Sequence, residues 1–325
     1  MEGQRLSGGG GGGGAGAPGG IGALVPGGRR EVRVVADAEE LTRAAAEEVA
    51  ATLAKAAAGF PSDKPGVSRL ATSGRGSDGR QSRHSFLVGA ATFVLSGGST
   101  PRALYRLLAD PNAPWRGRID WPAVHFFWGD ERHVPPDHPD SNFRMAREAM
   151  LDHVPAPAAH VHRIAGEEPD AARAAERYER ELIDLFALWA GGDDGEGGEG
   201  AASAAGSGWP RFDLVLLGLG EEGHTASLFP GSPLLAGTRP PGWLAAAVWV
   251  EKLATWRITL TAAAINHAAN VIFLVSGAAK APALAAVLEG EPQPQLYPAQ
   301  VVAPIQGRLL WLVDRAAAAQ LRSSA

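Results

Sequence analysis

The chain has 325 residues, of which 45% are hydrophobic and 20% charged, so we expect a globular protein with a sizeable buried core. Its net charge of −5 leaves no basic surplus for binding nucleic acid or an anionic membrane surface. The chain has no cysteine, which excludes disulfides and thiolate ligands, and no apolar run near the roughly 18 residues of a membrane span, so we expect a cytoplasmic protein.

Three glycine-rich stretches predict segments without regular structure. Residues 1–30 contain SGGGGGGGAGAPGG, which buries too little apolar surface to offset the entropy of ordering, and they lack the pattern of a secretory signal. Residues 61–83 and 191–208 are rich in Gly, Ser and charge and are predicted to be flexible inserts. The rest of the chain, residues 31–325, is predicted to be a single α/β domain.

Short apolar runs alternate with Ala-, Leu- and Glu-rich segments along this domain. The runs predict strands at 31–36, 91–97, 124–130, 212–218, 245–250, 257–261, 270–277 and 308–314. Helices are predicted at 38–57, 101–109, 169–190 and 278–289. The runs lack the alternation of half-exposed strands, which predicts a mostly parallel, Rossmann-like sheet with helices on both faces. Ligands of such sheets bind beyond the carboxyl ends of the strands, so the residues just after each run are the candidate ligand-binding positions.

The first strand end with polar chemistry reads LSGGSTP. Gly97 and Gly98 allow a tight turn, and Ser99 and Thr100 supply hydroxyls. Pro101 suits the first turn of a helix. Backbone N–H groups at a helix start bind anions, so Gly97, Gly98, Ser99 and Thr100 are candidate phosphate ligands, with an ordinary helix cap as the alternative.

The second strand end reads WGDERHVPPDHPDSNF. Arg132 is a candidate to hold a phosphate through two parallel hydrogen bonds. Asp130 is a candidate for the same pocket, or else a surface charge or the partner of Arg132. Asp140 or Ser141 is expected to start a helix, in which Asn142 and Arg144 are ligand candidates with capping as the alternative.

Three histidines in this region, His125, His133 and His138, lie near acids. Their spacing fits no zinc signature. No metal site is therefore predicted.

The third strand end, GLGEEGHTASLFPG at 218–231, fits the dinucleotide pattern G-x-G-x-x-G. Glu221 and Glu222 would place two carboxylates where a pyrophosphate should lie. Pro230 and Gly231 cut short the helix that should follow, and no acid lies about 20 residues beyond, because Glu251 comes too late. These features argue against a dinucleotide site.

His224 gives the same stretch another interpretation. A histidine on a glycine turn at a strand end can act as a general base near neutral pH, and Glu222 can fix its tautomer. A structural histidine is the alternative. Lys252 and Arg257 lie around a later strand, where each is either a phosphate ligand or a surface charge.

Taken in order, LSGGSTP, WGDERHVPPDHPDSNF, LLGLGEEGHTASLFPG, RITLT and VIFLVSGAAKAPAL resemble the 6-phosphogluconolactonase family over residues 31–325. The family shares its fold with glucosamine-6-phosphate deaminase and ribose-5-phosphate isomerase. The resemblance implies hydrolysis of 6-phospho-D-glucono-1,5-lactone to 6-phospho-D-gluconate, the second step of the oxidative pentose phosphate pathway, without a cofactor.

By position, the resemblance makes His224 the catalytic histidine and Gly97–Thr100 the phosphate loop. Arg132 matches the family's D-E-R arginine, and Lys252 and Arg257 match its later basic residues. The family usually has Asp-Gly-His where this chain has Glu222-Gly223-His224, which leaves the helper role of residue 222 open.

Two other functions remain open at this point. A deaminase-like enzyme of the same fold would carry a further glutamate after its histidine, but no acid lies between His224 and Glu251. A non-catalytic sugar-phosphate sensor would bind the sugar without opening the lactone. We expect a small-molecule substrate, no nucleic-acid or membrane partner, and a monomer or weak homodimer.

Overall fold

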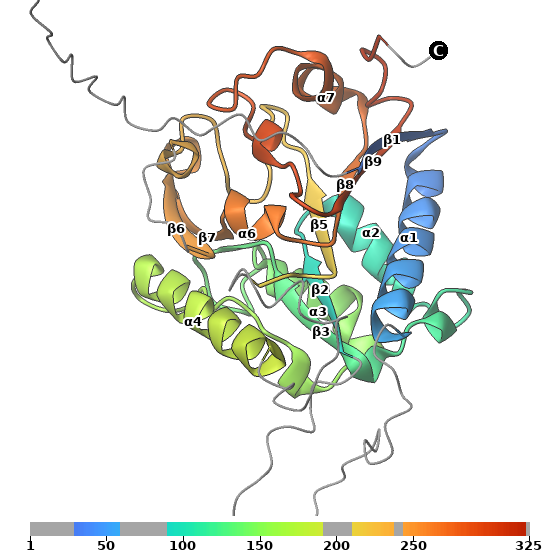
Figure 1. Ribbon diagram of the computed structural model, residues 1–325, viewed down its shortest axis with the longest axis vertical. Helices are drawn as coiled ribbons and strands as arrows, with labels where there is room; N and C mark the ends of the chain where they lie inside the picture. Colours follow the sequence, from blue (N-terminus) through green and yellow to red (C-terminus); the bar gives the residue numbers. More distant parts are fainter. Residues whose placement is uncertain (1–28, 59–89, 191–209, 237–242, 323–325) are drawn as a thin grey trace, which may run out of the picture.

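A parallel six-stranded sheet forms the centre of the computed structural model, which describes residues 29–58, 90–190, 210–236 and 243–322 (Figure 1). Its strand order is β1-β9-β8-β5-β2-β3. The strands are β1 (Arg29–Val35), β2 (Ala91–Leu95), β3 (Val124–Trp128), β5 (Leu214–Gly218), β8 (Asn270–Val275) and β9 (Arg308–Asp314). The predicted parallel sheet is thus confirmed. Strand β1 starts ahead of residue 31, and the rest of the predicted tail and both predicted inserts lie outside the described residues.

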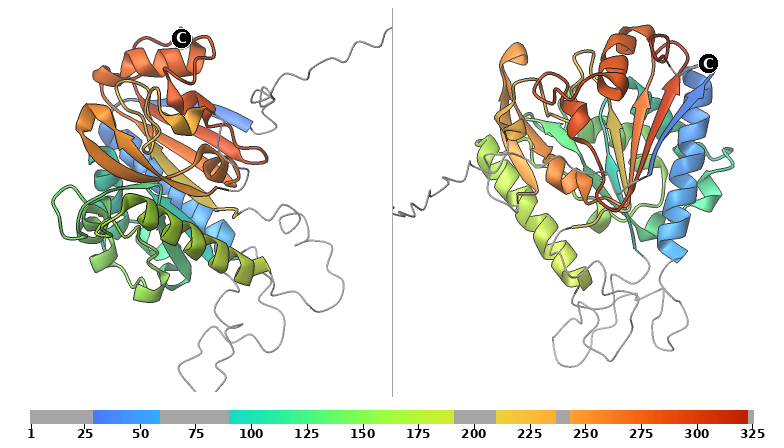
Figure 2. Two further views of the ribbon diagram at one scale, coloured as in Figure 1. Left: turned by 90° about the vertical axis from the view of Figure 1, so that its left-hand side faces the viewer. Right: turned by 45° about the horizontal axis from the view of Figure 1, so that its top comes forward.

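Helices flank this sheet on both sides, as predicted. Figure 2 shows α1 and α4 on opposite sides of the strands. The helices are α1 (Ala38–Ala58), α2 (Ser99–Ala109), α3 (Asn142–Ala149), α4 (Ala171–Ala190), α6 (Ala262–Asn266) and α7 (Ala281–Glu289). In the described parts of the chain, no helix combines the length and apolar character needed to cross a membrane.

The sequence pattern accounts for most helix boundaries. Ser141 caps α3, because its hydroxyl accepts the N–H of Arg144 at 3.1 Å. Helix α2 begins at Ser99, ahead of the predicted start at residue 101, and the predicted helix at 278–289 is a 3₁₀ turn (278–280) followed by α7. The short α6 was not predicted.

Two of the predicted strands belong to a second sheet. Strands β6 (Ala245–Val250) and β7 (Thr255–Leu260) pair antiparallel with each other, and β7 pairs antiparallel with β4 (Asp130–Arg132). The predicted strand at 124–130 ends at Trp128. Gly129 accepts the N–H of Leu260, so the chain passes from the large sheet into the small one at this glycine.

Buried tyrosines complete the hydrogen bonding of two strand ends near the site. The hydroxyl of Tyr105 donates to the carbonyl of Ser96 at 2.9 Å and accepts its N–H at 2.8 Å, just after β2. Tyr178 makes the same pair of bonds with Trp128 at the end of β3, both at 3.0 Å. Each hydroxyl thus pairs with both backbone groups of one residue at a strand end.

Candidate functional site

A pocket of about 350 Å³ lies at the carboxyl ends of β2, β5 and β8, where it is closed by the small sheet. Parallel strands place all their following loops at one edge, so segments far apart in sequence meet there. The lining residues are Ser96, Gly97, Gly98, Asp130, Arg132, Asn142, Gly218, Leu219, Gly220, Glu222, His224, Ala226, Ser227, Phe229, Lys252, Leu253, Arg257 and Lys280.

The loop after β5 presents His224 through a tight turn without any helix in residues 219–232. Gly223 has a φ of 81°, in the left-handed region that favours glycine, and its N–H donates to the carbonyl of Gly220 at 3.0 Å. A β-carbon at residue 220 would lie 2.0 Å from Nδ1 of His224. The glycines therefore serve to place the imidazole, and the stretch has no dinucleotide cradle.

Glu222 and Phe229 surround the imidazole. Nδ1 of His224 lies 3.3 Å from Oε2 of Glu222, close enough for an ion pair but outside hydrogen-bond geometry. The ring of Phe229 stacks on the imidazole with centroids 4.1 Å apart. Burial lowers the pKa of His224 below its ordinary value, although the Glu222 carboxylate opposes that shift. This shift favours the neutral imidazole, the form that can accept a proton.

Two arginines face each other across β4 and β7. Arg132 and Arg257 are directly paired in the antiparallel register, which puts both side chains on one face of the small sheet. Nε of each guanidinium is buried and has no hydrogen-bond partner within the described residues. Burial, and then the charge of Arg132, lower the pKa of Arg257. An anion bound between the two would relieve this repulsion and satisfy both groups.

Two lysines also line the pocket and add to the positive charge of Arg132 and Arg257. Nζ of Lys252 lies 3.2 Å from Oε1 of Glu222, and Nζ of Lys280 lies 3.9 Å from Glu221. Burial alone would raise the pKa of Glu222, but its own backbone N–H and the charges of His224 and Lys252 lower it. Lys280 was not singled out from the sequence, although it follows the end of β8 and so meets the same strand-end criterion.

The structure corrects the two open interpretations of Asp130. Its carboxylate is buried, with only 8% of the residue exposed, so it is not a surface charge. It accepts hydrogen bonds from Ser227 and Asn142, and it forms no ion pair with Arg132. Asp130 thus lines the pocket, with its carboxylate held by hydrogen bonds from Asn142 and Ser227.

The other candidates divide between the pocket and its surroundings. Ser99 and Thr100 begin α2 and are not among the lining residues, whereas Gly97 and Gly98 are. Arg144 is paired with Glu148 outside the pocket. Of the sequence candidates, the pocket brings together Gly97, Gly98, Asp130, Arg132, Asn142, Glu222, His224, Lys252 and Arg257.

The three histidines considered for a metal lie apart from the pocket. His125 is buried and its ring stacks with those of His160 and His162, and His133 bonds to the carbonyl of Glu168. In the described ranges, no group of three His, Asp or Glu side chains could hold a metal ion.

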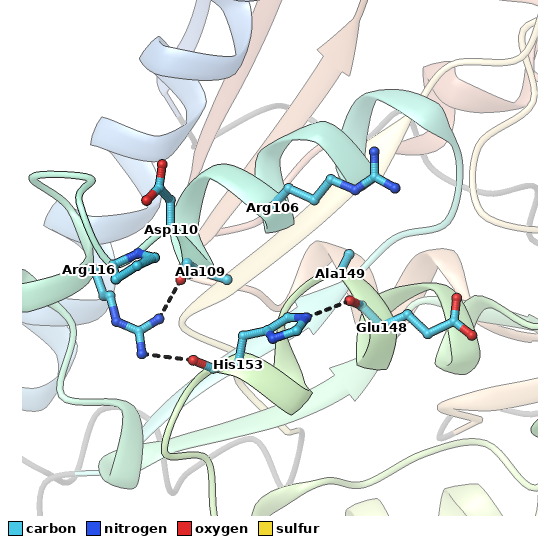
Figure 3. A pocket seen from close by; sticks show the side chains of 8 residues that line it. Arg106, Ala109, Asp110, Arg116, Glu148, Ala149 and His153 are labelled. Carbon is cyan, nitrogen blue, oxygen red and sulfur yellow. Dashed lines mark hydrogen bonds between the residues drawn. The ribbon is translucent and has the colours of Figure 1, made fainter.

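A larger pocket, of about 450 Å³, lies at the C-terminal ends of α2 and α3, whereas the strand-end pocket lies at their N-terminal ends (Figure 3). Its polar groups are largely bound to the chain itself. Arg116 donates to the carbonyls of Ala109 and His153, and the ring of His153 bonds to the carbonyl of Glu148 (Figure 3). This pocket therefore offers less free hydrogen-bonding capacity than the one at the strand ends.

Fold and pocket place the chain among α/β proteins with a small-molecule site at the carboxyl edge of a parallel sheet. The chain belongs to the family of glucosamine-6-phosphate isomerases and 6-phosphogluconolactonases, whose model matches residues 36–311. The 6-phosphogluconolactonases of Synechocystis sp. and Nostoc sp. are similar to it, at 43% and 41% identity over 72% of this chain and 86% and 85% of their own lengths.

Solved structures show the same relationship. The 6-phosphogluconolactonase of Trypanosoma brucei matches 90% of this chain and 99% of its own with a TM-score of 0.63 at 26% identity. A monomeric glucosamine-6-phosphate deaminase matches with a TM-score of 0.62 at 19% identity, which shows a shared fold alone.

Proposed function

We propose that this chain hydrolyses 6-phospho-D-glucono-1,5-lactone to 6-phospho-D-gluconate. The observation that carries the proposal is that His224, whose pKa is lowered by burial, shares one pocket with two facing arginines whose buried Nε atoms have no hydrogen-bond partner among the described residues. The curated relatives at 41–43% identity, which are named 6-phosphogluconolactonases, support the same activity.

In this proposal, the positive half of the pocket holds the substrate phosphate. Arg132 and Arg257 bind it from the small sheet, and the turn at Gly97 and Gly98 offers the N-terminus of α2. Lys252 and Lys280 add positive charge at the rim. Fixing the phosphate orients the lactone ring toward His224.

His224 then acts as the general base. It removes a proton from water while the water oxygen bonds to the lactone carbonyl carbon. The bond from that carbon to the ring oxygen breaks, and the imidazolium returns its proton to the departing oxygen. Glu222 stabilises the imidazolium and orients the ring, despite a side chain one methylene longer than aspartate.

A rate assay on freshly generated lactone tests this function. Formation of 6-phosphogluconate should exceed spontaneous hydrolysis by orders of magnitude. A rate equal to the spontaneous one would overturn the proposal. Release of ammonia from glucosamine 6-phosphate would indicate a deaminase instead, and binding of 6-phosphogluconate without lactone opening would indicate a sensor.

We also propose that residues 31–325 form a single domain and that the protein is a cytoplasmic monomer or weak homodimer. Sedimentation velocity at micromolar concentration measures the assembly state directly.

A further inference from the structure

The side chain of Asn142 connects β4 to the turn before α2. Asn142 is only 3% exposed, and its Nδ2 donates to the carbonyl oxygen of Asp130 at 2.9 Å and to Oδ1 of Asp130 at 3.2 Å. Because both of these atoms are acceptors, they fix which end of the amide faces β4. Oδ1 of Asn142 therefore faces Gly97, where a β-carbon would lie only 2.0 Å away.

Asp130 carries the connection onward to the His224 loop. Its Oδ2 accepts the hydroxyl of Ser227 at 2.7 Å, and the N–H of Ser227 donates to Oγ1 of Thr259 at 3.2 Å. Ser227 is 1% exposed and lies in the same loop as His224. A continuous row of contacts from Gly97 through Asn142 and Asp130 to Ser227 thus joins the anion-binding turn to the loop of the base.

We propose that Asn142 is a positioning residue that sets the geometry of two parts of the pocket, the His224 loop and the turn at Gly97 and Gly98. It acts through Asp130 on the His224 loop and through Gly97 on the turn before α2. The proposal deepens the lactonase function proposed above and rests on it. A buried carboxylate held by donors on both of its oxygens has little freedom to rotate, so removal of the amide frees it.

The charge of Asp130 gives this role a readout at His224. Burial is the largest effect and lowers the pKa of His224, Glu222 and Asp130 raise it, and Lys280 lowers it. If Asn142 holds the carboxylate of Asp130 in place, removal of its amide weakens the field at the imidazole. The titration of His224 should then shift to lower pH.

The test is Asn142→Ala, with two measurements. We expect kcat/KM to fall by about 10- to 100-fold. The kcat should fall because the His224 loop is no longer held in position, and the KM should rise because the turn at Gly97 is no longer held either. We also expect the imidazole resonance of His224, assigned with a His224 variant and followed by NMR, to titrate at lower pH. The NMR measurement needs no turnover, so it remains informative if the lactonase function itself fails.

Asn266→Ala is the matched control. Asn266 is 5% exposed, its amide donates to the carbonyl of Val301 at 2.8 Å and accepts the N–H of Ala303 at 2.8 Å, and it does not line the pocket. The Asn266→Ala variant should be less stable, but the titration of His224 and the kinetic constants of the folded enzyme should not change. Equal effects of the two substitutions on kinetics and titration would overturn the proposal.

Ser227→Ala gives a second, smaller change in the same row. It removes the hydroxyl that donates to Asp130, and it should shift the titration of His224 in the same direction as Asn142→Ala. It also serves if Asn142→Ala fails to fold. An unchanged titration in Ser227→Ala would contradict the proposed connection through Asp130.

Discussion

The chemistry proposed for this protein depends on a few side chains whose surroundings change their properties. Burial lowers the pKa of His224, which stacks on Phe229, and the Glu222 carboxylate raises that pKa in part. Burial and then the charge of Arg132 lower the pKa of Arg257, the latter as expected for two guanidinium groups that repel each other. Both features follow from placing charged groups in a partly desolvated pocket.

Replacement of His224 by alanine should lower turnover at least about 10²-fold, because general-base assistance is lost. Binding of 6-phosphogluconate, measured by calorimetry, should persist, since the arginines remain. His153→Ala is the control: His153 does not line the strand-end pocket, so this substitution should leave the rate unchanged. A His224→Ala enzyme with a near-normal rate would contradict the role of His224.

The pH dependence of kcat/KM should report the pKa of His224. The base works only when neutral, so activity should fall as pH decreases through that pKa, with a midpoint below the ordinary value of about 6.5. Glu222→Gln removes a charge that raises this pKa, so its midpoint should lie lower still. An unchanged midpoint in Glu222→Gln would show that the carboxylate does not act on His224.

Arg257→Gln should raise KM about 10- to 100-fold, the loss expected for a hydrogen bond to a charged group. The effect on kcat should be smaller, because the arginine holds the phosphate rather than the reacting carbon. Arg173→Gln, on the exposed face of α4, is the control and should change neither constant. An unchanged KM with a reduced kcat would argue against phosphate binding by Arg257.

At the scale of elements, β4 and the start of α3 form one unit. Glu131 is 2% exposed and accepts the N–H groups of Asn142 and Phe143 at 2.7 and 2.8 Å and the hydroxyl of Ser141 at 3.0 Å. Its carboxylate thus satisfies the first free donors of α3 and interacts with the helix dipole. Because Glu131 faces away from Asp130 and Arg132 on β4, the same short strand serves the helix on one face and the pocket on the other.

Glu131→Ala should lower the free energy of unfolding by about 3 kcal/mol, because it leaves buried helix donors without an acceptor. Urea denaturation measures the change. Glu176→Ala, at an exposed position on α4, should stay within about 0.5 kcal/mol of the parent. Similar losses in both variants would show that the carboxylate does not cap α3.

The sequence predicted the long elements well and the short ones poorly. The buried runs that became β2, β3, β5, β8 and β9 are strongly apolar, so local pattern alone identifies them. Strand β4 has only three residues, all charged, and exists because β7 pairs with it. Its partner lies more than a hundred residues away, and no local pattern encodes that pairing.

At the scale of the whole molecule, the pocket is where three parallel strands, the small sheet and the starts of α2 and α3 converge. The two buried tyrosines hydrogen-bond to the backbone at the ends of β2 and β3, which lead into this pocket. Burial raises the pKa of both Tyr105 and Tyr178 well above the ordinary value of about 10.

This burial should make the protein unstable to alkali. Above about pH 10 the unfolded chain releases the tyrosine protons while the folded chain retains them, so the free energy of unfolding should decrease as pH rises. The decrease between pH 8 and 11, measured by urea denaturation, should be smaller in the double variant Tyr105→Phe and Tyr178→Phe. An equal decrease in parent and variant would contradict this assignment.

The sequence by itself determined the chemistry available at each strand end: a glycine turn before a helix, an acid beside an arginine, and a histidine on a glycine loop. These signals depend on neighbours within a few residues, which is why they can be read locally. Only the tertiary structure decided that Arg132 lies opposite Arg257, that Asp130 is buried against Asn142 and Ser227, and that Lys280 reaches the pocket. Those contacts depend on strand register and on which parallel strands are neighbours, and both are settled by packing across the whole chain.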